Sequence, residues 1–357
     1  MMKRLQWLLT LVVMLTMLAL VSGCWRSAQY QKPAVAAPHH GPDRFISQSQ
    51  KSDSPFWDYL KMRWREGRIE SASANDIQAV MVAVDQALIQ AETPEPRVTW
   101  LGHAAVLVQY QGVSFLTDPH LSDHASPLPF GGPSRVVPPA LTVEQLPEVD
   151  FVVISHNHYD HLDHETVVAL GNRVHWYVPL GIQQWLLKRG IDSDNITELD
   201  WWQSESFGPG IEVVATPSQH WSKRTPFDTN KTLWASWHIN IHGFKTWFAG
   251  DTGYHAQRFQ QIGQQLGPHD LALIPIGAYG PRYFMLPQHV DPAQAVQTHL
   301  DVKSKHSVGI HWGTFELTHE PFLAPRKLLE ESAKELSHGV FETLQVGQTR
   351  LLTLQVE

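Results

Sequence analysis

The sequence predicts an α/β fold in which short strands, many of them paired in hairpins, are mixed with helices. Short apolar runs are bounded by turn residues such as Gln111-Gly112 and His242-Gly243, a pattern that is typical of paired strands. Helical patterns occur between some of these runs but not after every one, so the order is not a strict βαβ repeat. Of the 357 residues, 43% are apolar and 17% are charged, which favours a large globular core.

The first 24 residues have the pattern of a lipoprotein signal. Lys3 and Arg4 precede an apolar run, and this run ends in the letters LVSGC, which resemble a bacterial lipobox. Cys24 is the only cysteine, so we expect a signal peptide of residues 1–23 and a lipid anchor on Cys24. An uncleaved signal anchor and an ordinary secretory signal are the alternatives. Trp25 in place of Asp favours the outer membrane, facing the periplasm, if the host has two membranes.

Three further regions follow the signal. Residues 24–53 are rich in Ser, Gln, Pro and Ala, so we expect a flexible tether in which the pair His39-His40 is solvated. A metal site at this pair is the less favoured alternative. Residues 54–96 are expected to form a helical extension that packs on the domain, and residues 97–357 to form the α/β domain itself. The apolar stripe of the first helix in the extension consists of Trp57, Leu60 and Trp64.

Periodicity and turn residues locate the elements in order. The predicted strands are residues 98–101, 105–110, 113–117, 150–155, 211–215, 235–241, 245–248, 271–276, 307–310 and 350–356. The predicted helices are residues 55–67, 74–90, 181–189, 292–300 and 325–336. Asp291 and Pro292 are typical of the start of a helix.

The strongest chemical pattern is the run HNHYDH, residues 156–161, which directly follows the apolar strand at 150–155. The chain has 21 His and one Cys, so a metal site here must use His and carboxylate ligands. His156 and His158, two residues apart, can share one ion, and Asp160 and His161 can reach a second. A loop at the carboxyl end of a strand is a common position for an active site.

Three single candidates lie in loops after later strands. His220 lies in TPSQHWSKR, Asp251 in AGDTGY and His311 in IHWGTF. Each of these three residues alone is explained equally well as a turn or core residue. Together with the four residues at 156–161 they make seven candidate ligands, a number that suits two metals. Asp118 and His103 are candidates to orient the ligands, because metal-bound histidines usually donate their other N–H to a carboxylate or carbonyl group.

These motifs resemble the metallo-β-lactamase superfamily. The segments VTWLGHA, FLTDP, ISHNHYDHLD, TPSQHWSKR, AGDTGY, PIGAYGPR, QHVDP and IHWGTF occur in the order typical of the N-acyl-phosphatidylethanolamine-hydrolysing phospholipase D family. The resemblance runs from residue 98 to residue 315. It implies a four-layer αβ/βα sandwich with two zinc ions, although iron or manganese also suits these ligands.

The resemblance also implies roles for individual residues. His156, His158 and His220 would bind one zinc ion; Asp160, His161 and His311 would bind the other; and Asp251 would bridge both. Lys223 would bind phosphate and His289 would contact the substrate. The family suggests a homodimer. The net charge of −8 argues against nucleic acid as a partner.

The implied reaction is cleavage of N-acyl-phosphatidylethanolamine, a membrane phospholipid, into N-acylethanolamine and phosphatidic acid. In the expected mechanism a hydroxide shared by the metals attacks phosphorus, and Asp160 and Asp251 accept its proton. One alternative is a metal-dependent hydrolase of another ester, such as a lactone or a small phosphodiester. Another is a non-enzymatic, lipid-binding envelope lipoprotein with a relic metal site. All seven ligand positions are filled, which counts against a relic.

Overall fold

A computed structural model describes residues 27–47, 55–69, 71–92, 94–127 and 131–353. The predicted signal peptide at 1–23 and its cysteine, Cys24, lie outside these residues. Within the described ranges, no helix is both long enough and apolar enough to span a membrane.

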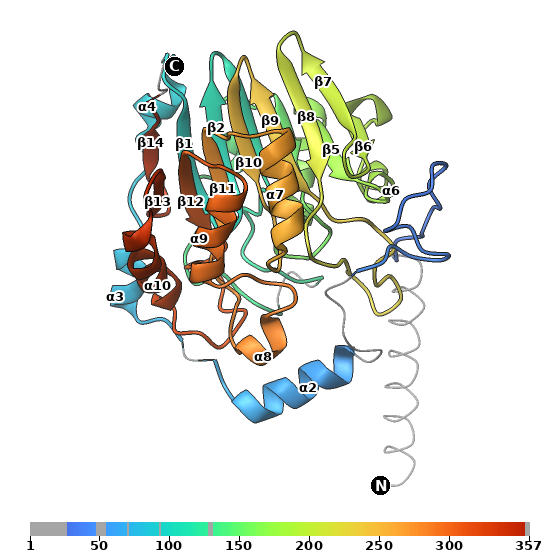
Figure 1. The fold of residues 1–357 in the computed structure, drawn as a ribbon, viewed down its shortest axis with the longest axis horizontal. Coiled ribbons are helices and arrows are strands. Elements are labelled where there is room, and N and C mark those ends of the chain that lie inside the picture. The colour runs from blue at the N-terminus through green and yellow to red at the C-terminus, as the bar shows by residue number, and fades with distance from the viewer. Residues whose placement is uncertain (1–26, 48–54, 70, 93, 128–130, 354–357) are drawn as a thin grey trace, which may run out of the picture.

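Two mixed sheets face each other in the centre of the molecule (Figure 1). The first has the strand order β14-β1-β2-β3-β4-β5-β6 and the second the order β13-β12-β11-β10-β9-β8-β7. The strands of the first sheet are β1 (Arg97–Gly102), β2 (Ala105–Tyr110), β3 (Val113–Thr117), β4 (Phe151–Val153), β5 (His175–Pro179), β6 (Ile196–Leu199) and β14 (Thr349–Leu351). Those of the second are β7 (Ser204–Gly208), β8 (Ile211–Thr216), β9 (Ser236–Ile241), β10 (Phe244–Phe248), β11 (Leu271–Pro275), β12 (His306–Ile310) and β13 (Val340–Thr343).

Helices cover the outer face of each sheet. On the first sheet lie α5 (His164–Leu170) and α6 (Gln183–Leu187), and on the second lie α7 (Ala256–Gln265), α9 (Pro292–Asp301) and α10 (Ala324–Ser332). The expected four-layer αβ/βα sandwich is therefore confirmed. The remaining α-helices of the described chain are α2 (Pro55–Glu66), α3 (Ala74–Ala79), α4 (Gln86–Gln90) and α8 (Arg282–Met285).

Local sequence explains the tight turns and one helix start. Gln111 and Gly112 have φ values of 48° and 78°, and His242 and Gly243 have values of 50° and 96°. Two successive positive φ values give the turn whose twist matches that of a hairpin. Asp291 accepts a hydrogen bond from the backbone of Gln294 and so caps α9 as predicted.

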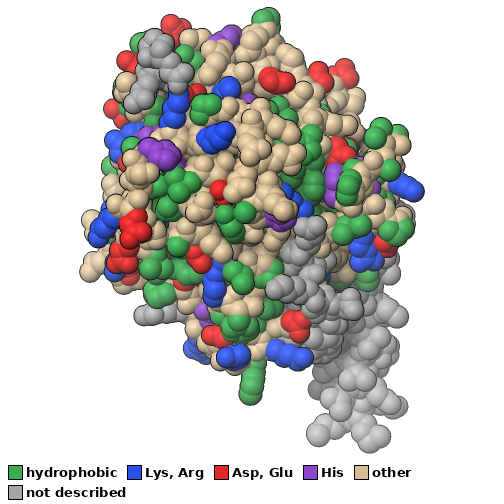
Figure 2. Space-filling view, viewed as in Figure 1, with side chains coloured by type: hydrophobic (Ala, Val, Ile, Leu, Met, Phe, Trp, Pro, Cys, Tyr) green, Lys and Arg blue, Asp and Glu red, His purple; other side chains and the backbone are tan. Residues whose placement is uncertain are grey.

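The two sheets are joined through a core of large side chains. Trp237 on β9 is fully buried, and its Nε1–H donates to the carbonyl of Ile154, 2.8 Å away at the end of β4. This bond links the second sheet to the segment that leads into residues 156–161. On the face shown in Figure 2, Lys and Arg side chains are interspersed with Asp and Glu.

Two expectations about the N-terminal region are wrong. Residues 27–47 do not behave as a free tether, because Phe45 is 1% exposed and packs against Leu233 and Trp234. His39 and His40 are likewise not solvated, since both rings lie against Asp200. Helix α2 forms where expected, but Trp64 is 89% exposed and does not pack on the domain.

Candidate metal centre

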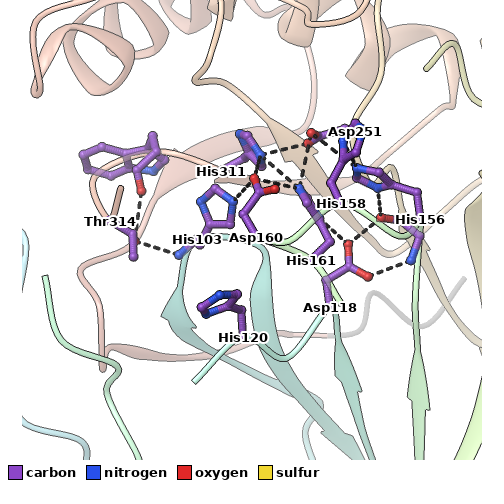
Figure 3. Close-up of polar contacts among 12 residues, drawn as sticks. His103, Asp118, His120, His156, His158, Asp160, His161, Asp251, His311 and Thr314 are labelled. Carbon is purple, nitrogen blue, oxygen red and sulfur yellow. Dashed lines mark hydrogen bonds and ion pairs between the residues drawn. The ribbon is translucent and has the colours of Figure 1, made fainter. Parts of the chain in front are cut away.

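The candidate ligands come together at one end of the two sheets, where several strands finish. The loop after β4 carries residues 156–161, and the loops after β8, β10 and β12 carry His220, Asp251 and His311. The carboxyl ends of neighbouring parallel strands meet at one edge of a sheet, and here the edges of both sheets meet. Figure 3 shows side chains from both sheets pointing to one place.

Close approach of the two sheets at this end requires a glycine. Gly250, directly before Asp251, has φ 59°, and a Cβ atom there would lie 2.4 Å from the Cβ of Ser155. Any larger residue would push the loop after β10 away from the loop after β4. Gly250 thus brings the Asp251 carboxylate to the histidines at 156–161.

The first group consists of His156, His158 and His220. His156 Nε2 lies 2.7 Å from His158 Nδ1, and His220 Nε2 lies 3.3 Å from the same atom. The rings of His156 and His220 are buried, and that of His158 is partly exposed. His220 Nδ1 is 3.1 Å from the carbonyl oxygen of Gln288, to which it can donate, so that Nε2 is the nitrogen that faces the other two histidines. Three imidazole nitrogens therefore converge on one point.

The second group consists of Asp160, His161 and His311. Nε2 of His161 is 3.1 Å from Nε2 of His311, and Asp160 Oδ2 is 3.3 Å and 3.4 Å from those two atoms. His103 Nε2 donates to Asp160 Oδ2 at 2.9 Å. The backbone of His103 and His311 is left-handed, with φ values of 55° and 61°. Such backbone costs energy in non-glycine residues and often marks a functional site.

Asp251 lies between the groups. Its Oδ2 atom is 3.7 Å from His220 Nε2 and 3.2 Å from His161 Nε2, and its Oδ1 atom is 3.0 Å from His311 Nε2. One carboxylate therefore reaches both groups. The structure thus brings together all seven residues that the sequence singled out as metal ligands, and it divides them as the resemblance implies.

The two predicted substrate contacts are placed differently. His289 joins the cluster: its Nδ1 atom is 3.9 Å from Asp251 Oδ2 and has no hydrogen-bond partner in the described chain. Lys223 is held beside the cluster through its backbone, whose N–H donates to Asn157 Oδ1 at 2.8 Å.

Asp118 orients the cluster from behind, as the sequence suggested. Its Oδ2 atom accepts from His161 Nδ1 at 2.6 Å, and its Oδ1 atom accepts from the backbone N–H of Ser155 at 2.6 Å. The Ser155 hydroxyl contacts both Asp118 and His156 Nδ1. Because Asp118 is fully buried, its carboxylate fixes the ring orientation of His161 without contact with solvent.

Sequence reasoning missed Arg224, which stabilises the loop at 156–161. This guanidinium group donates from Nη1 to the carbonyl groups of Asn157, His158 and Leu162, and it stacks on Tyr159 with 4.0 Å from Cζ to the ring centroid. The hydroxyl of Tyr159 in turn donates to the carbonyl of Arg224. The motif HWSKR contains Arg224 beside Lys223, but its partners are backbone atoms of a distant loop, which no sequence pattern reveals.

The electrostatic setting differs between the two groups. Burial lowers the pKa of His158 to about 4 and that of His220 to about 3. Burial also acts on His311, but the carboxylates of Asp251 and Asp160 outweigh it and raise its pKa to about 9. The surrounding imidazoles, with His161 foremost, overcome the opposing effect of burial and hold the pKa of Asp160 well below its usual range.

This donor set fits two divalent cations. Each group offers buried imidazole and carboxylate atoms that lie within 4.8 Å of one another, and Asp251 can serve both. Ring nitrogens only 2.7 to 3.3 Å apart need either a proton or a cation between them. Imidazole and carboxylate suit zinc, iron and manganese alike.

Comparison with known proteins agrees with this geometry. A family model described as a β-lactamase superfamily domain matches residues 114–312. The chain belongs to the metallo-β-lactamase superfamily. Members of this superfamily include metal-dependent hydrolases, and the chain is accordingly a metal-dependent hydrolase by family.

Within the superfamily the chain is 43% identical over 263 residues to N-acyl-phosphatidylethanolamine-hydrolyzing phospholipase D 1 of Caenorhabditis elegans, covering 70% of this chain and 74% of the relative. It is 37% identical to the mitochondrial enzyme of the same name from Saccharomyces cerevisiae, covering 66% of this chain and 51% of the relative. The chain therefore spans about half the length of the yeast relative. Among solved structures, a metallo hydrolase from Ignicoccus hospitalis shares the fold, with a TM-score of 0.56, 21% identity, and coverage of 73% of this chain and 99% of that one.

The pKa difference predicts that the two ions respond differently to pH. An imidazole must be neutral to bind a metal, so an ion in the group with His311 has to displace a proton below pH 9, whereas His158 and His220 are already neutral at pH 7. As the pH falls from about 9 to about 6, affinity for the ion in the group with His311 should drop about tenfold per pH unit for each proton released. Affinity for the ion in the group with His158 and His220 should stay level. Zinc bound per chain, measured after dialysis over this range, should fall from two to one. Simultaneous loss of both ions would contradict the prediction.

The contacts of Asp118 predict a loss of metal affinity in Asp118→Asn. An amide has one acceptor oxygen, so its NH2 group must face either the Ser155 N–H or the ring of His161. Affinity for the ion held by His161 should fall about 10–100-fold. Chelator competition measures this fall. The exposed Asp194→Asn is the matched control and should bind both ions as the unmodified chain does.

Proposed function

We propose that this metal-dependent hydrolase is a phosphodiesterase of the phospholipase D type that cleaves N-acyl-phosphatidylethanolamine to N-acylethanolamine and phosphatidic acid, with zinc as its metal. The observation that carries the proposal is the pair of ligand groups that Asp251 joins. It is supported by 43% identity to a relative named as an N-acyl-phosphatidylethanolamine-hydrolyzing phospholipase D. When bound, two ions would supply an activated water and neutralise charge on the phosphodiester.

The remaining chemistry belongs to the side chains. Asp160 and Asp251 both have pKa values well below the usual range, because neighbouring imidazoles outweigh the effect of burial, so both are carboxylates at neutral pH. They can accept the proton that water gives up when its oxygen attacks phosphorus. The bond from phosphorus to the ethanolamine oxygen breaks, and this oxygen takes the proton from the carboxyl group that accepted it, so that N-acylethanolamine leaves and the carboxylate is restored.

Two residues at the rim complete the site. The backbone bond to Asn157 places Lys223 beside the loop at 156–161, where its ammonium group can pair with the phosphate. The unpartnered Nδ1 of His289 is available for a hydrogen bond to the substrate.

Turnover tests the proposal directly. The full chain in detergent should release N-acylethanolamine and phosphatidic acid, detected by mass, and should lose this activity on chelation and regain it with zinc. His158→Ala should lower kcat/KM by more than the roughly 10–100-fold that is typical of losing a group that only orients a ligand. Lys223→Ala should lower kcat/KM about ten- to a hundredfold, because it removes a bond to a charged group.

The exposed His338→Ala serves as the control and should keep full activity. A folded, metal-loaded chain that leaves N-acyl-phosphatidylethanolamine intact would overturn the proposal. Hydrolysis of a lactone or a small phosphodiester by that same preparation would identify another ester as the substrate, and no hydrolysis at all would favour a lipid-binding lipoprotein.

We also propose the attachment that the N-terminal residues predict. The chain would be held in the outer membrane, facing the periplasm, by acyl groups on Cys24, close to a phospholipid substrate, and would assemble as a homodimer. The mass of the N-terminal peptide from membrane-purified protein should correspond to acylated Cys24. A peptide that starts before residue 24 would contradict the anchor, and a monomer in size-exclusion chromatography would contradict the dimer.

A further inference from the structure

The segment at residues 27–47, which we call the strap, lies against the loop that carries His220. This loop, residues 217–235, connects β8 to β9 and is called the His220 loop below. Figure 1 shows the strap in dark blue at the side of the domain, next to the loop that leads out of β8. The composition of the strap predicts a mobile tether, yet Phe45, near its C-terminal end, is buried. This burial requires an explanation.

The strap is hydrogen-bonded to the His220 loop near both of its ends. At one end Ser27 Oγ and Thr225 Oγ1 are 2.6 Å apart, and the backbone N–H of Ala28 donates to Asp228 Oδ2. Further along, the backbone N–H of Phe45 donates to the carbonyl of Asn230 at 2.8 Å. Such backbone contacts fix the register of the strap on the loop.

The last described residue of the strap reaches a candidate metal ligand. The hydroxyl of Ser47 donates to the carbonyl oxygen of His220 at 2.5 Å. The side chain of His220 is held separately, through Nδ1, by the carbonyl of Gln288. The carbonyl of Gln288 thus positions the ring of His220, and the strap positions its backbone.

Apolar contacts hold the strap in place between these bonds. Phe45 packs in a cluster with Leu233 and Trp234 of the His220 loop, and Tyr30 meets its ring edge-on with 5.1 Å between centroids. The indole Nε1–H of Trp234 donates to the carbonyl of Ser218, two residues before His220. Burial of Phe45 is therefore connected through Trp234 to the backbone next to the ligand.

Inside the His220 loop, Asn230 transmits the contact. Its backbone has φ 57°, and its side chain Oδ1 accepts from the N–H of Ser222, while its own N–H donates to the carbonyl of Ser222. The same residue offers its carbonyl to Phe45. Ser222 lies two residues after His220, so the strap braces the loop on both sides of the ligand.

His39 and His40 fasten the strap to the domain rather than bind a metal. The Nδ1 atom of His40 accepts the backbone N–H of Ala37 at 3.1 Å, so the ring proton is on Nε2, which faces Asp200 Oδ2 at 2.8 Å. A nitrogen that carries a proton offers no lone pair to a cation. His39 Nε2 contacts the other oxygen of Asp200 at 2.6 Å, and its ring stacks on Trp201.

We infer that the strap is part of the metal centre, with Phe45 and Ser47 as positioning residues that hold His220 where it meets His156 and His158. The inference rests on the two-metal centre but not on the identity of the substrate. It concerns one ion only, because the contacts described here end on His220 and not on the second group of ligands. Loss of the strap should therefore weaken the two metal sites unequally.

Metal binding by variants of the full chain in detergent tests this inference. Phe45→Ala with Ser47→Ala should weaken one zinc ion about 10–100-fold in chelator competition and leave the other unchanged, as for loss of a group that orients a ligand. Ser47→Thr keeps the hydroxyl and, in an otherwise unmodified chain, should retain the affinity that Ser47→Ala loses. Val35→Ala, in an exposed strap residue, is the matched control and should bind both ions normally.

A second background identifies the affected ion. His220→Ala removes the ligand itself, so the strap substitutions should have no further effect on the ion that this variant still binds. Equal weakening of both ions by the strap substitutions would indicate general destabilisation and would overturn the inference. Unchanged affinity for both ions, with hydrogen exchange showing a detached strap, would overturn it as well. Because no measurement uses substrate, an incorrect substrate assignment cannot alter the outcome.

Discussion

The Asp251 carboxylate is the constraint on which the rest of the site depends. It is almost fully buried and stands within 4 Å of imidazole nitrogens from both ligand groups. A charged group in such a place is costly unless it is paired with opposite charge. Two shared cations would meet this requirement for Asp251 and Asp160 together, and they would also separate the lone pairs of the crowded histidines.

The two-sheet fold can hold so many polar groups close together because loops from two rigid sheets share them. His158 and Asp160 come from the first sheet, whereas His220, Asp251 and His311 come from the second. Trp237 joins the two sheets through the carbonyl of Ile154, two residues before the loop at 156–161. The centre therefore forms only when both sheets are packed together, which ties its geometry to the core of the domain.

The ligands are surrounded by groups that fix them without taking part in chemistry. Asp118 holds His161, Arg224 holds the carbonyl groups of the loop at 156–161, and the strap holds the backbone of His220. Arg224 is half-buried, and its three carbonyl partners replace water that its guanidinium group would otherwise bind. His161, the loop at 156–161 and His220 are thus held by three different parts of the chain.

The sequence by itself determined the fold class, most strands, and all seven candidate ligands, because these depend on local patterns. Alternating apolar runs, Gln111-Gly112 turns and the HNHYDH run are readable without any partner. Strands β5, β6, β7 and β13 were not predicted, and neither was helix α7. Of these, β7 is a largely exposed polar strand defined by its pairing with β8, and α7 has few apolar residues and a histidine as its cap. Residues 27–47 read as a tether for the same reason, since their composition is that of a linker. Only the tertiary structure decided that Phe45 is buried, that Trp64 is exposed and that Arg224 reaches the ligand loop, because each of these depends on residues far away in the chain.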